Sequence, residues 1–148
     1  MDLVIGYGND LRRDDGAGPV VARALEALGL PGLRVVVAHQ LLPEHAELLA
    51  RTRRVVFVDA AVGRSDEVAC APLDPATAPL PGLGHGCDPA ALVAMAEALY
   101  GSKPRAWIVT IPAHDLALGE GLTEETRKLL PSALAAIRAV IEKIEDHG

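Results

Sequence analysis

Short apolar segments alternate with segments of helical character along most of this chain. Four segments have the length and the nearly continuous apolar composition of buried strands, namely residues 3–8, 33–38, 54–59 and 106–111. Strands that are covered on both faces of a sheet have this composition. A fifth, weaker strand is expected at residues 67–72.

Helices are expected between these strands, over residues 19–28, 43–51, 89–100 and 123–145. Pro19 stands near the start of the first helix and Gly29 just past its end, as is usual for these two residues. Thr123 is expected to cap the last helical region, and Pro131 to break or kink it. The alternation predicts an α/β fold: a three-layer sandwich with a mostly parallel, twisted sheet and helices on both faces.

The composition fits one ordinary domain that spans residues 1–148. Half of the residues are hydrophobic but only 3% are aromatic, so Val, Leu, Ile and Ala must build the core. The net charge is −6, and positive residues form no run longer than the pairs Arg12-Arg13 and Arg53-Arg54. This pattern argues against a nucleic-acid-binding surface, which needs clustered positive charge.

The cysteines and the start of the chain suggest a reducing compartment. Cys70 and Cys87 are the two cysteines, and no CxxC pair is present. Cys70 lies in an apolar stretch and is expected to be buried. We expect neither a signal peptide nor a membrane span, because no apolar stretch has the required length or flanks. The expectation is a cytoplasmic protein without a membrane partner, and a monomer is favoured.

Polar residues cluster where the expected strands end. Asn9, Asp14 and Asp15 follow the first strand, Asp59 ends the third, and His85 lies in a long loop rich in proline and glycine. His39 and Gln40, and His114 and Asp115, follow two other strands and are expected at the rim. Ligands of such sheets bind at the carboxyl ends of the strands. The first and third strands would lie about 4.8 Å apart if they are neighbours, as in the common 2-1-3 order.

Two carboxylates and one imidazole at that edge have three possible roles. Asp15, Asp59 and His85 would suit a divalent metal with open coordination positions. The two carboxylates would also suit acid–base chemistry, because like charges raise one pKa. The third role is structural: a helix cap at Asp15, a turn cap at Asp59 and a solvated loop residue at His85.

Other motifs carry less weight. Gly6-x-Gly8 suggests a nucleotide-binding turn, but Leu11 stands where the pattern G-x-G-x-x-G needs its third glycine. Cys87 lies two residues after His85, yet no third group is evident to orient a thiol–imidazole pair. His45 is expected on a solvated helix face.

The opening motif resembles that of a known family. Residues 6–19 read G-Y-G-N-D-L-R-R-D-D-G-A-G-P, and this is similar to the pattern G-x-G-N-x-L-x-x-D-[DE]-G-x-G of the hydrogenase maturation endopeptidases. Three further regions are similar to that family: residues 40–44 with 56–60, His85 with the helix after it, and residues 108–112 with 119–123. Two departures are Ile111 before Pro112, where the family often has Gln, and the proline-rich loop before His85.

The resemblance implies a specific activity. Members cut the C-terminal extension from the large-subunit precursor of a nickel–iron hydrogenase after nickel has been inserted. The motif match assigns the metal-binding and catalytic positions to Asp15, Asp59 and His85, with nickel supplied by the precursor. The rival hypotheses are a non-catalytic chaperone that binds the metal or the precursor on the same fold, and a nucleotide-binding module.

Overall fold

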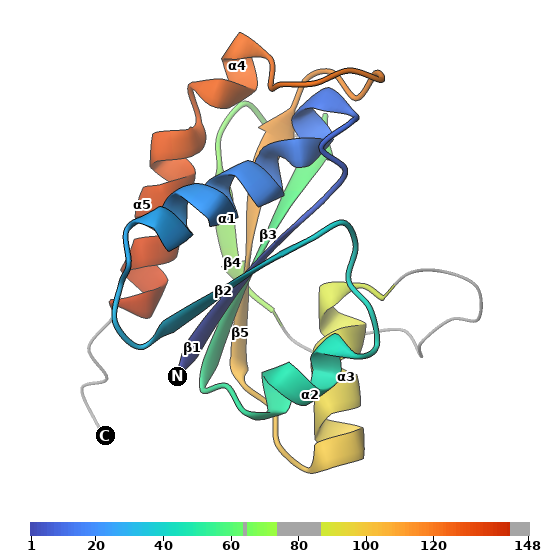
Figure 1. Cartoon of the computed structure of the whole chain (residues 1–148), viewed down its shortest axis with the longest axis vertical. Coiled ribbons are helices and arrows are strands. Elements are labelled where there is room, and N and C mark those ends of the chain that lie inside the picture. Colours follow the sequence, from blue (N-terminus) through green and yellow to red (C-terminus); the bar gives the residue numbers. More distant parts are fainter. Residues whose placement is uncertain (64, 74–86, 143–148) are drawn as a thin grey trace.

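The computed structural model describes residues 1–63, 65–73 and 87–142. Its centre is a five-stranded sheet with the strand order β2-β1-β3-β5-β4 (Figure 1). The strands are β1 (Asp2–Tyr7), β2 (Leu33–Ala38), β3 (Arg54–Val62), β4 (Ala69–Pro72) and β5 (Arg105–Ala113). All neighbouring pairs are parallel except β4 with β5. The predicted mostly parallel sheet is therefore confirmed, and its first three strands take the common 2-1-3 order, so β1 and β3 are neighbours.

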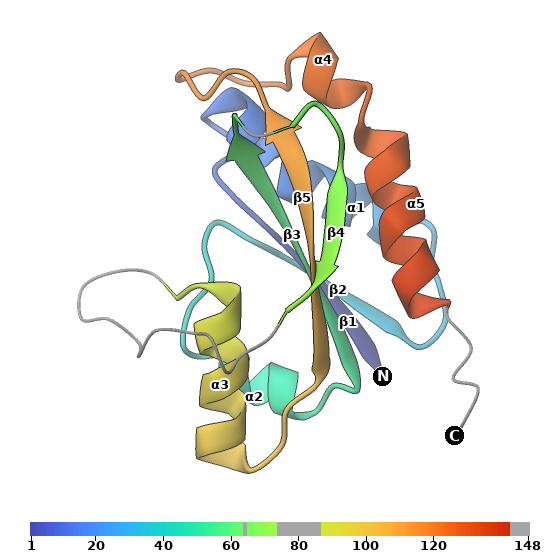
Figure 2. The same ribbon diagram turned by 180° about the vertical axis from the view of Figure 1, so that it is seen from behind.

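Helices cover both faces of this sheet. The helices are η1 (Arg13–Gly16), α1 (Ala17–Ala27), α2 (His45–Ala50), α3 (Pro89–Tyr100), α4 (Glu124–Arg127) and α5 (Leu130–Ile141). Helices α1 and α5 lie on one face, and α2 and α3 lie on the other (Figures 1 and 2). Alternate residues of β1 and β3 feed two separate aliphatic cores: Val4 and Val56 pack toward α1 and α5, whereas Leu3 and Phe57 pack toward α2 and α3. The three-layer prediction is confirmed.

Some boundaries differ from those expected. Strand β3 continues three residues past Asp59 because it stays paired with β5 as far as Val62. Pro131 stands in the first turn of α5 and separates it from α4, so the predicted break is confirmed. Helix α5 spans Leu130–Ile141, and residues 143–145 of the expected helix lie outside the described residues. None of the helices within the described ranges is long and apolar enough to cross a membrane.

The prediction that Cys70 is buried is wrong. Cys70 lies in β4, where all four residues are exposed. Strand β4 pairs with β5 at the edge of the sheet. An apolar sequence therefore does not guarantee burial at an edge strand, where helices need not cover both faces.

A buried ion pair ties the amino edge of the sheet to α5. The guanidinium of Arg54 donates to both carboxylate oxygens of Asp2, at 3.2 and 3.0 Å. It also donates to the carbonyl oxygens of Val140 and Ile141, each at 3.1 Å. Charge-assisted bidentate pairs are the strong class of hydrogen bond. This contact anchors the end of α5 at the amino edge of the sheet, opposite the carboxyl edge where the polar residues of the candidate site lie.

Two glycines of the opening motif allow α1 to pack closely on the sheet. A Cβ atom on Gly18 would lie 2.5 Å from the carbonyl oxygen of Val58 and 2.6 Å from that of Tyr7. A Cβ atom on Gly6 would likewise collide with the carbonyl oxygen of Gly18. The start of α1 thus touches β1 and β3 directly, backbone against backbone.

We expect Gly18→Ala to destabilise the fold by about 1–3 kcal/mol, because overpacking forces the backbone to move. The measurement is the midpoint and slope of urea unfolding. Ala24→Ser, which adds one atom on the exposed side of the same helix, is the matched control and should change stability by less than about 0.5 kcal/mol. Equal midpoints for the two variants would contradict the close packing.

Candidate active site

Tyr7 and Asp59 lie side by side at the carboxyl edge of the sheet. Gly6 of β1 pairs with Val58 of β3, so the next residue of each strand is also adjacent. Both side chains belong to the face on which α2 and α3 pack, because Ile5 and Phe57, two residues earlier, pack there. The Tyr7 hydroxyl lies close enough to the Asp59 carboxylate for each group to shift the pKa of the other.

Turn η1 brings Asp15 to the same edge. The backbone N–H of Asn9 donates to Oδ2 of Asp15 at 2.8 Å. Gly8 has a φ of +148°, and a side chain at this position would collide with the carbonyl oxygen of Asp15. The chain therefore folds back tightly after β1. This tight return places the half-buried Asp15 close enough to Asp59 for their charges to interact.

Burial and like charge act together on Asp59. Burial raises the pKa of Asp59, and the negative charge of Asp15 raises it further, against hydrogen bonds from Tyr7 and from the backbone N–H of Ala60. Burial also raises the pKa of the Tyr7 hydroxyl far above its usual value, as do the charges of Asp59 and Asp88. Tyr7 therefore remains a neutral hydrogen-bond donor. A cation between the two carboxylates would relieve their repulsion, so this donor set fits a divalent metal.

The start of α3 also reaches this part of the molecule. Asp88 caps the helix, since its Oδ1 accepts from the backbone N–H of Ala91 at 2.7 Å. Its charge acts on Tyr7, and Cys87 packs against the core under α2 and α3. His85 precedes Asp88 by three residues and lies outside the described residues. Within the described ranges, no group of three or more His, Cys, Asp or Glu side chains is placed to hold a metal ion.

Solved structures of one class of protein share this architecture. No protein-family model and no curated protein matches the sequence. The hydrogenase maturating endopeptidase HybD from E. coli superposes with a TM-score of 0.75 at 20% identity, over 96% of this chain and 92% of that one. The [NiFe] hydrogenase maturation protease HycI from Thermococcus kodakarensis gives 0.70 at 23% identity, over 97% and 93%. The HybD protease from the same organism gives 0.69 at 19% identity, over 95% and 98%.

The chain has the fold of the hydrogenase maturation endopeptidases. The similarity extends over nearly the whole length of both chains in each comparison. Within this fold, Asp15 and Asp59 of the predicted triplet lie at the carboxyl edge close enough for the charge of Asp15 to act on Asp59, and their role as metal ligands stays a prediction. The predicted place of the third member, His85, stays a prediction.

Two residues near the site were not singled out from the sequence. Tyr7 lies two positions after Ile5, on the same side of β1. Its polar neighbour, Asp59, belongs to another strand and becomes evident only from the pairing of β1 with β3. Asp14 was expected only among the polar residues that follow the first strand. The side chain of Asp14 is fully buried, whereas that of its neighbour Asp15 is only half-buried.

The remaining histidines have local roles. His45 is partly exposed beside Glu44 and Glu47, and its Nδ1 accepts from the backbone N–H of Leu42 at 3.0 Å. His39 is exposed just after β2. His114 is exposed at the end of β5, but its Nδ1 lies 2.8 Å from Oγ1 of Thr126.

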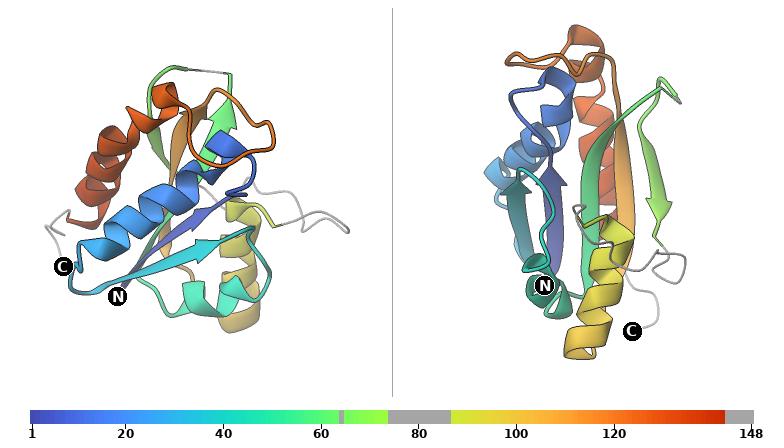
Figure 3. Two further views of the ribbon diagram at one scale, coloured as in Figure 1. Left: turned by 45° about the horizontal axis from the view of Figure 1, so that its top comes forward. Right: turned by 90° about the vertical axis from the view of Figure 1, so that its right-hand side faces the viewer.

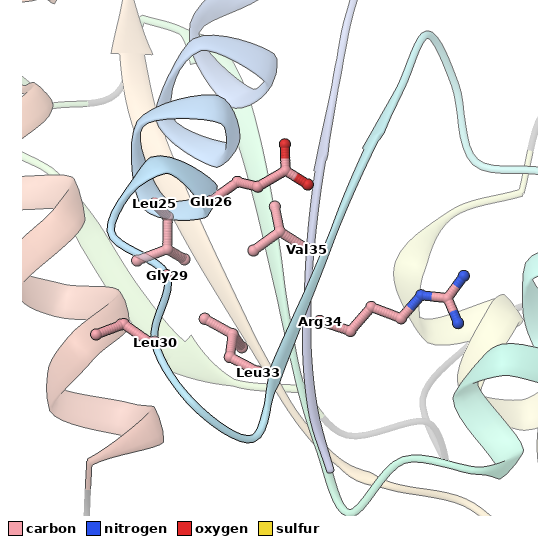
Figure 4. A pocket seen from close by; sticks show the side chains of 7 residues that line it. All are labelled: Leu25, Glu26, Gly29, Leu30, Leu33, Arg34 and Val35. Carbon is pink, nitrogen blue, oxygen red and sulfur yellow. The ribbon is translucent and has the colours of Figure 1, made fainter.

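A cavity at the opposite edge of the sheet is not part of this site. It has a volume of about 340 Å³ and lies between the end of α1 and the start of β2 (Figure 4). Its lining residues are Leu25, Glu26, Gly29, Leu30, Leu33, Arg34 and Val35. Leu33 pairs with Asp2 at the amino end of β1, so the cavity is separated from Asp15 and Asp59 by the length of the strands.

Proposed function

We propose that this protein is an endopeptidase that removes the C-terminal extension of a nickel–iron hydrogenase large-subunit precursor after nickel insertion. The observation that carries the proposal is the pairing of Asp15 with Asp59 at the carboxyl edge of an endopeptidase-type fold. His85 completes the triplet that contacts the metal. The opening motif, residues 6–19, supports the same assignment because its glycines create the tight turn that carries Asp15.

Nickel enters this scheme as part of the substrate. Carboxylate and imidazole are accepted nickel ligands, and within the described residues neither Asp15 nor Asp59 forms an ion pair with a cationic side chain. A nickel ion held by precursor thiolates would add contacts to Asp15, Asp59 and His85 and so locate one peptide bond beside them. Proximity of this kind supplies a large share of a catalytic rate.

The raised pKa of Asp59 favours this carboxylate as the base in peptide hydrolysis. In the metal-free site, burial and the charge of Asp15 raise the pKa of Asp59, and a higher pKa makes a carboxylate a stronger base. In the proposed reaction Asp59 accepts a proton from the water that attacks the peptide carbonyl, and it returns this proton to the amine nitrogen as the C–N bond breaks. The neutral Tyr7 hydroxyl beside Asp59 is a donor that would help to orient this carboxylate. We place the reaction in the cytoplasm, where unpaired thiols such as Cys70 and Cys87 persist.

The direct test is mass analysis of the C-terminus of hydrogenase large subunits in cells with and without this protein. The proposal requires that one precursor keeps its extension when the protein is missing and loses it when the protein is restored. Identical C-termini in both cell lines for every candidate precursor would refute it. Retention of the extension together with missing nickel would favour the chaperone hypothesis, in which the protein acts before the cut.

The nucleotide-binding hypothesis is disfavoured by packing. The glycines that suggest a phosphate-binding turn, Gly6 and Gly8, face the backbone of Gly18 and Asp15 rather than open space. Phosphate-binding loops keep such space free for the ligand. Saturable binding of a nucleotide in calorimetry would reverse this conclusion.

We expect Cys87→Ser to leave precursor cleavage within about twofold of normal, because Cys87 is not poised as a nucleophile. Burial and the adjacent Asp88 charge both raise the pKa of the Cys87 thiol, so the reactive thiolate is disfavoured. The measurement is the rate of C-terminal peptide release. A loss of more than about tenfold with an unchanged circular dichroism spectrum would revive a thiol mechanism.

A further inference from the structure

The carboxylate of Asp14 is fully buried and surrounded by hydrogen-bond donors. It accepts from the backbone N–H groups of His114, Asp115 and Thr123 at 2.7, 3.0 and 2.7 Å. It also accepts from the hydroxyls of Thr123 and Thr126 at 2.8 and 2.9 Å. All five donors lie in residues 114–126, the segment from the end of β5 into α4, more than 90 positions along the chain from Asp14.

The same segment is bonded to the neighbours of Asp14. The backbone N–H of Asp14 donates to the carbonyl of Asp115 at 3.0 Å, and that of Arg13 donates to Gly119 at 3.1 Å. The N–H of Gly119 in turn donates to the carbonyl of Leu11 at 2.8 Å. Figures 1 and 3 show this orange loop lying against the start of the blue helix at one end of the sheet. Turn η1 belongs to the motif at residues 6–19, but it is held in place by residues 114–126, which lie outside that motif.

The chemistry of this contact requires a charged group at position 14. Five donors point at this carboxylate, and hydrogen bonds of this kind stabilise the ionised form of an acid. Thr126 has one hydroxyl hydrogen, yet its oxygen lies within 2.9 Å of both Asp14 and the carbonyl of Pro112. Both of these atoms are acceptors for the Thr126 hydroxyl, and the Nδ1 of His114 lies 2.8 Å from the same hydroxyl oxygen.

We infer that Asp14 is a positioning residue, which together with residues 114–126 fixes turn η1 so that Asp15 faces Asp59 before the substrate arrives. Asp15 is the next residue in the turn, and its backbone N–H donates to Arg12 at 3.0 Å within it. On the other side of this turn, Gly8 packs directly against the carbonyl oxygen of Asp15. Rotation of the turn would swing Asp15 away from Asp59, so the Asp14 contact pre-organises the site. The catalytic consequence rests on the proposed function, whereas the structural consequence does not.

The test compares Thr126→Val, which keeps the shape but removes one donor to Asp14, with Thr126→Ser, which keeps the hydroxyl. Amide hydrogen exchange reports whether turn η1 opens. We expect Thr126→Val to speed exchange at Asp14 and Asp15 at least tenfold, with helix α3 and strand β1 unchanged. With nickel-loaded precursor, kcat should fall at least tenfold while KM stays within about twofold, and Thr126→Ser should restore both readouts.

Unchanged exchange at Asp14 and Asp15 in Thr126→Val would overturn the inference, as would exchange that rises equally throughout the chain. If Thr126→Val does not fold, Thr123→Val serves the same comparison, because it removes a different hydroxyl donor to the Asp14 carboxylate. If the unaltered protein cuts no precursor, the proposed function fails, but the exchange measurement still decides the role of Asp14. Faster exchange without any change in kcat would refute the positioning role and leave Asp14 purely structural.

Discussion

Asp59→Asn is expected to slow release of the C-terminal peptide at least about 100-fold, which is the usual loss when a positioned acid–base group is removed. The amide keeps the shape of the side chain but carries no charge for nickel and is a poor base. It also removes the repulsion from Asp15, so stability should not fall much. His85→Ala is expected to cause a loss of similar size, because His85 is the only nitrogen ligand in the proposed triplet. The measurement is peptide release from nickel-loaded precursor by mass spectrometry.

Asp66→Asn is the matched control for Asp59→Asn. Asp66 is exposed and follows β3 by four residues, so the same chemical change is made outside the site. This variant should cut the precursor at the normal rate. If Asp59→Asn and Asp66→Asn are equally active, the carboxylate pair has no catalytic role and the assignment of the site is wrong.

Nickel-loaded precursor is expected to be cut at least about 100-fold faster than nickel-free precursor, which corresponds to about 2.8 kcal/mol of differential binding. The described part of the site offers two carboxylates and no thiolate, so it is incomplete as a nickel site on its own. Nickel already held by the precursor would bring the missing ligands with it. The enzyme would then act as a checkpoint that processes only loaded precursor.

The checkpoint is measured by incubating the purified protein with both forms of the precursor and following the released peptide. Asp15→Asn supplies the internal comparison, since loss of one proposed nickel contact should reduce cutting of the loaded form and leave the slow cutting of the empty form nearly unchanged. Equal cutting of loaded and empty precursor by the unaltered protein would disprove the checkpoint, even if Asp15 and Asp59 were essential.

Local patterns in the sequence determined the architecture and the edge at which the site lies. The apolar runs around Val4, Phe57 and Val109 are long enough for buried strands, and their alternation with helices leaves few topologies other than a parallel sheet. Asp15 follows such a strand and Asp59 lies in the last part of another, and the carboxyl ends of parallel strands meet at one edge. Their convergence could therefore be predicted from strand order alone.

The roles of Tyr7, Asp14 and Cys70 were decided only by tertiary structure. Asp14 and Asp15 are adjacent and chemically identical, yet Asp14 is buried under residues 114–126 and Asp15 faces the site. Tyr7 meets Asp59 through strand register, and Cys70 is exposed because β4 takes the edge of the sheet. Each outcome depends on contacts between segments that are far apart in the chain. A local pattern of residues cannot predict which of these contacts form. Sequence thus determined which residues are near the carboxyl edge, and packing decided which of them point into the site and which hold it in place.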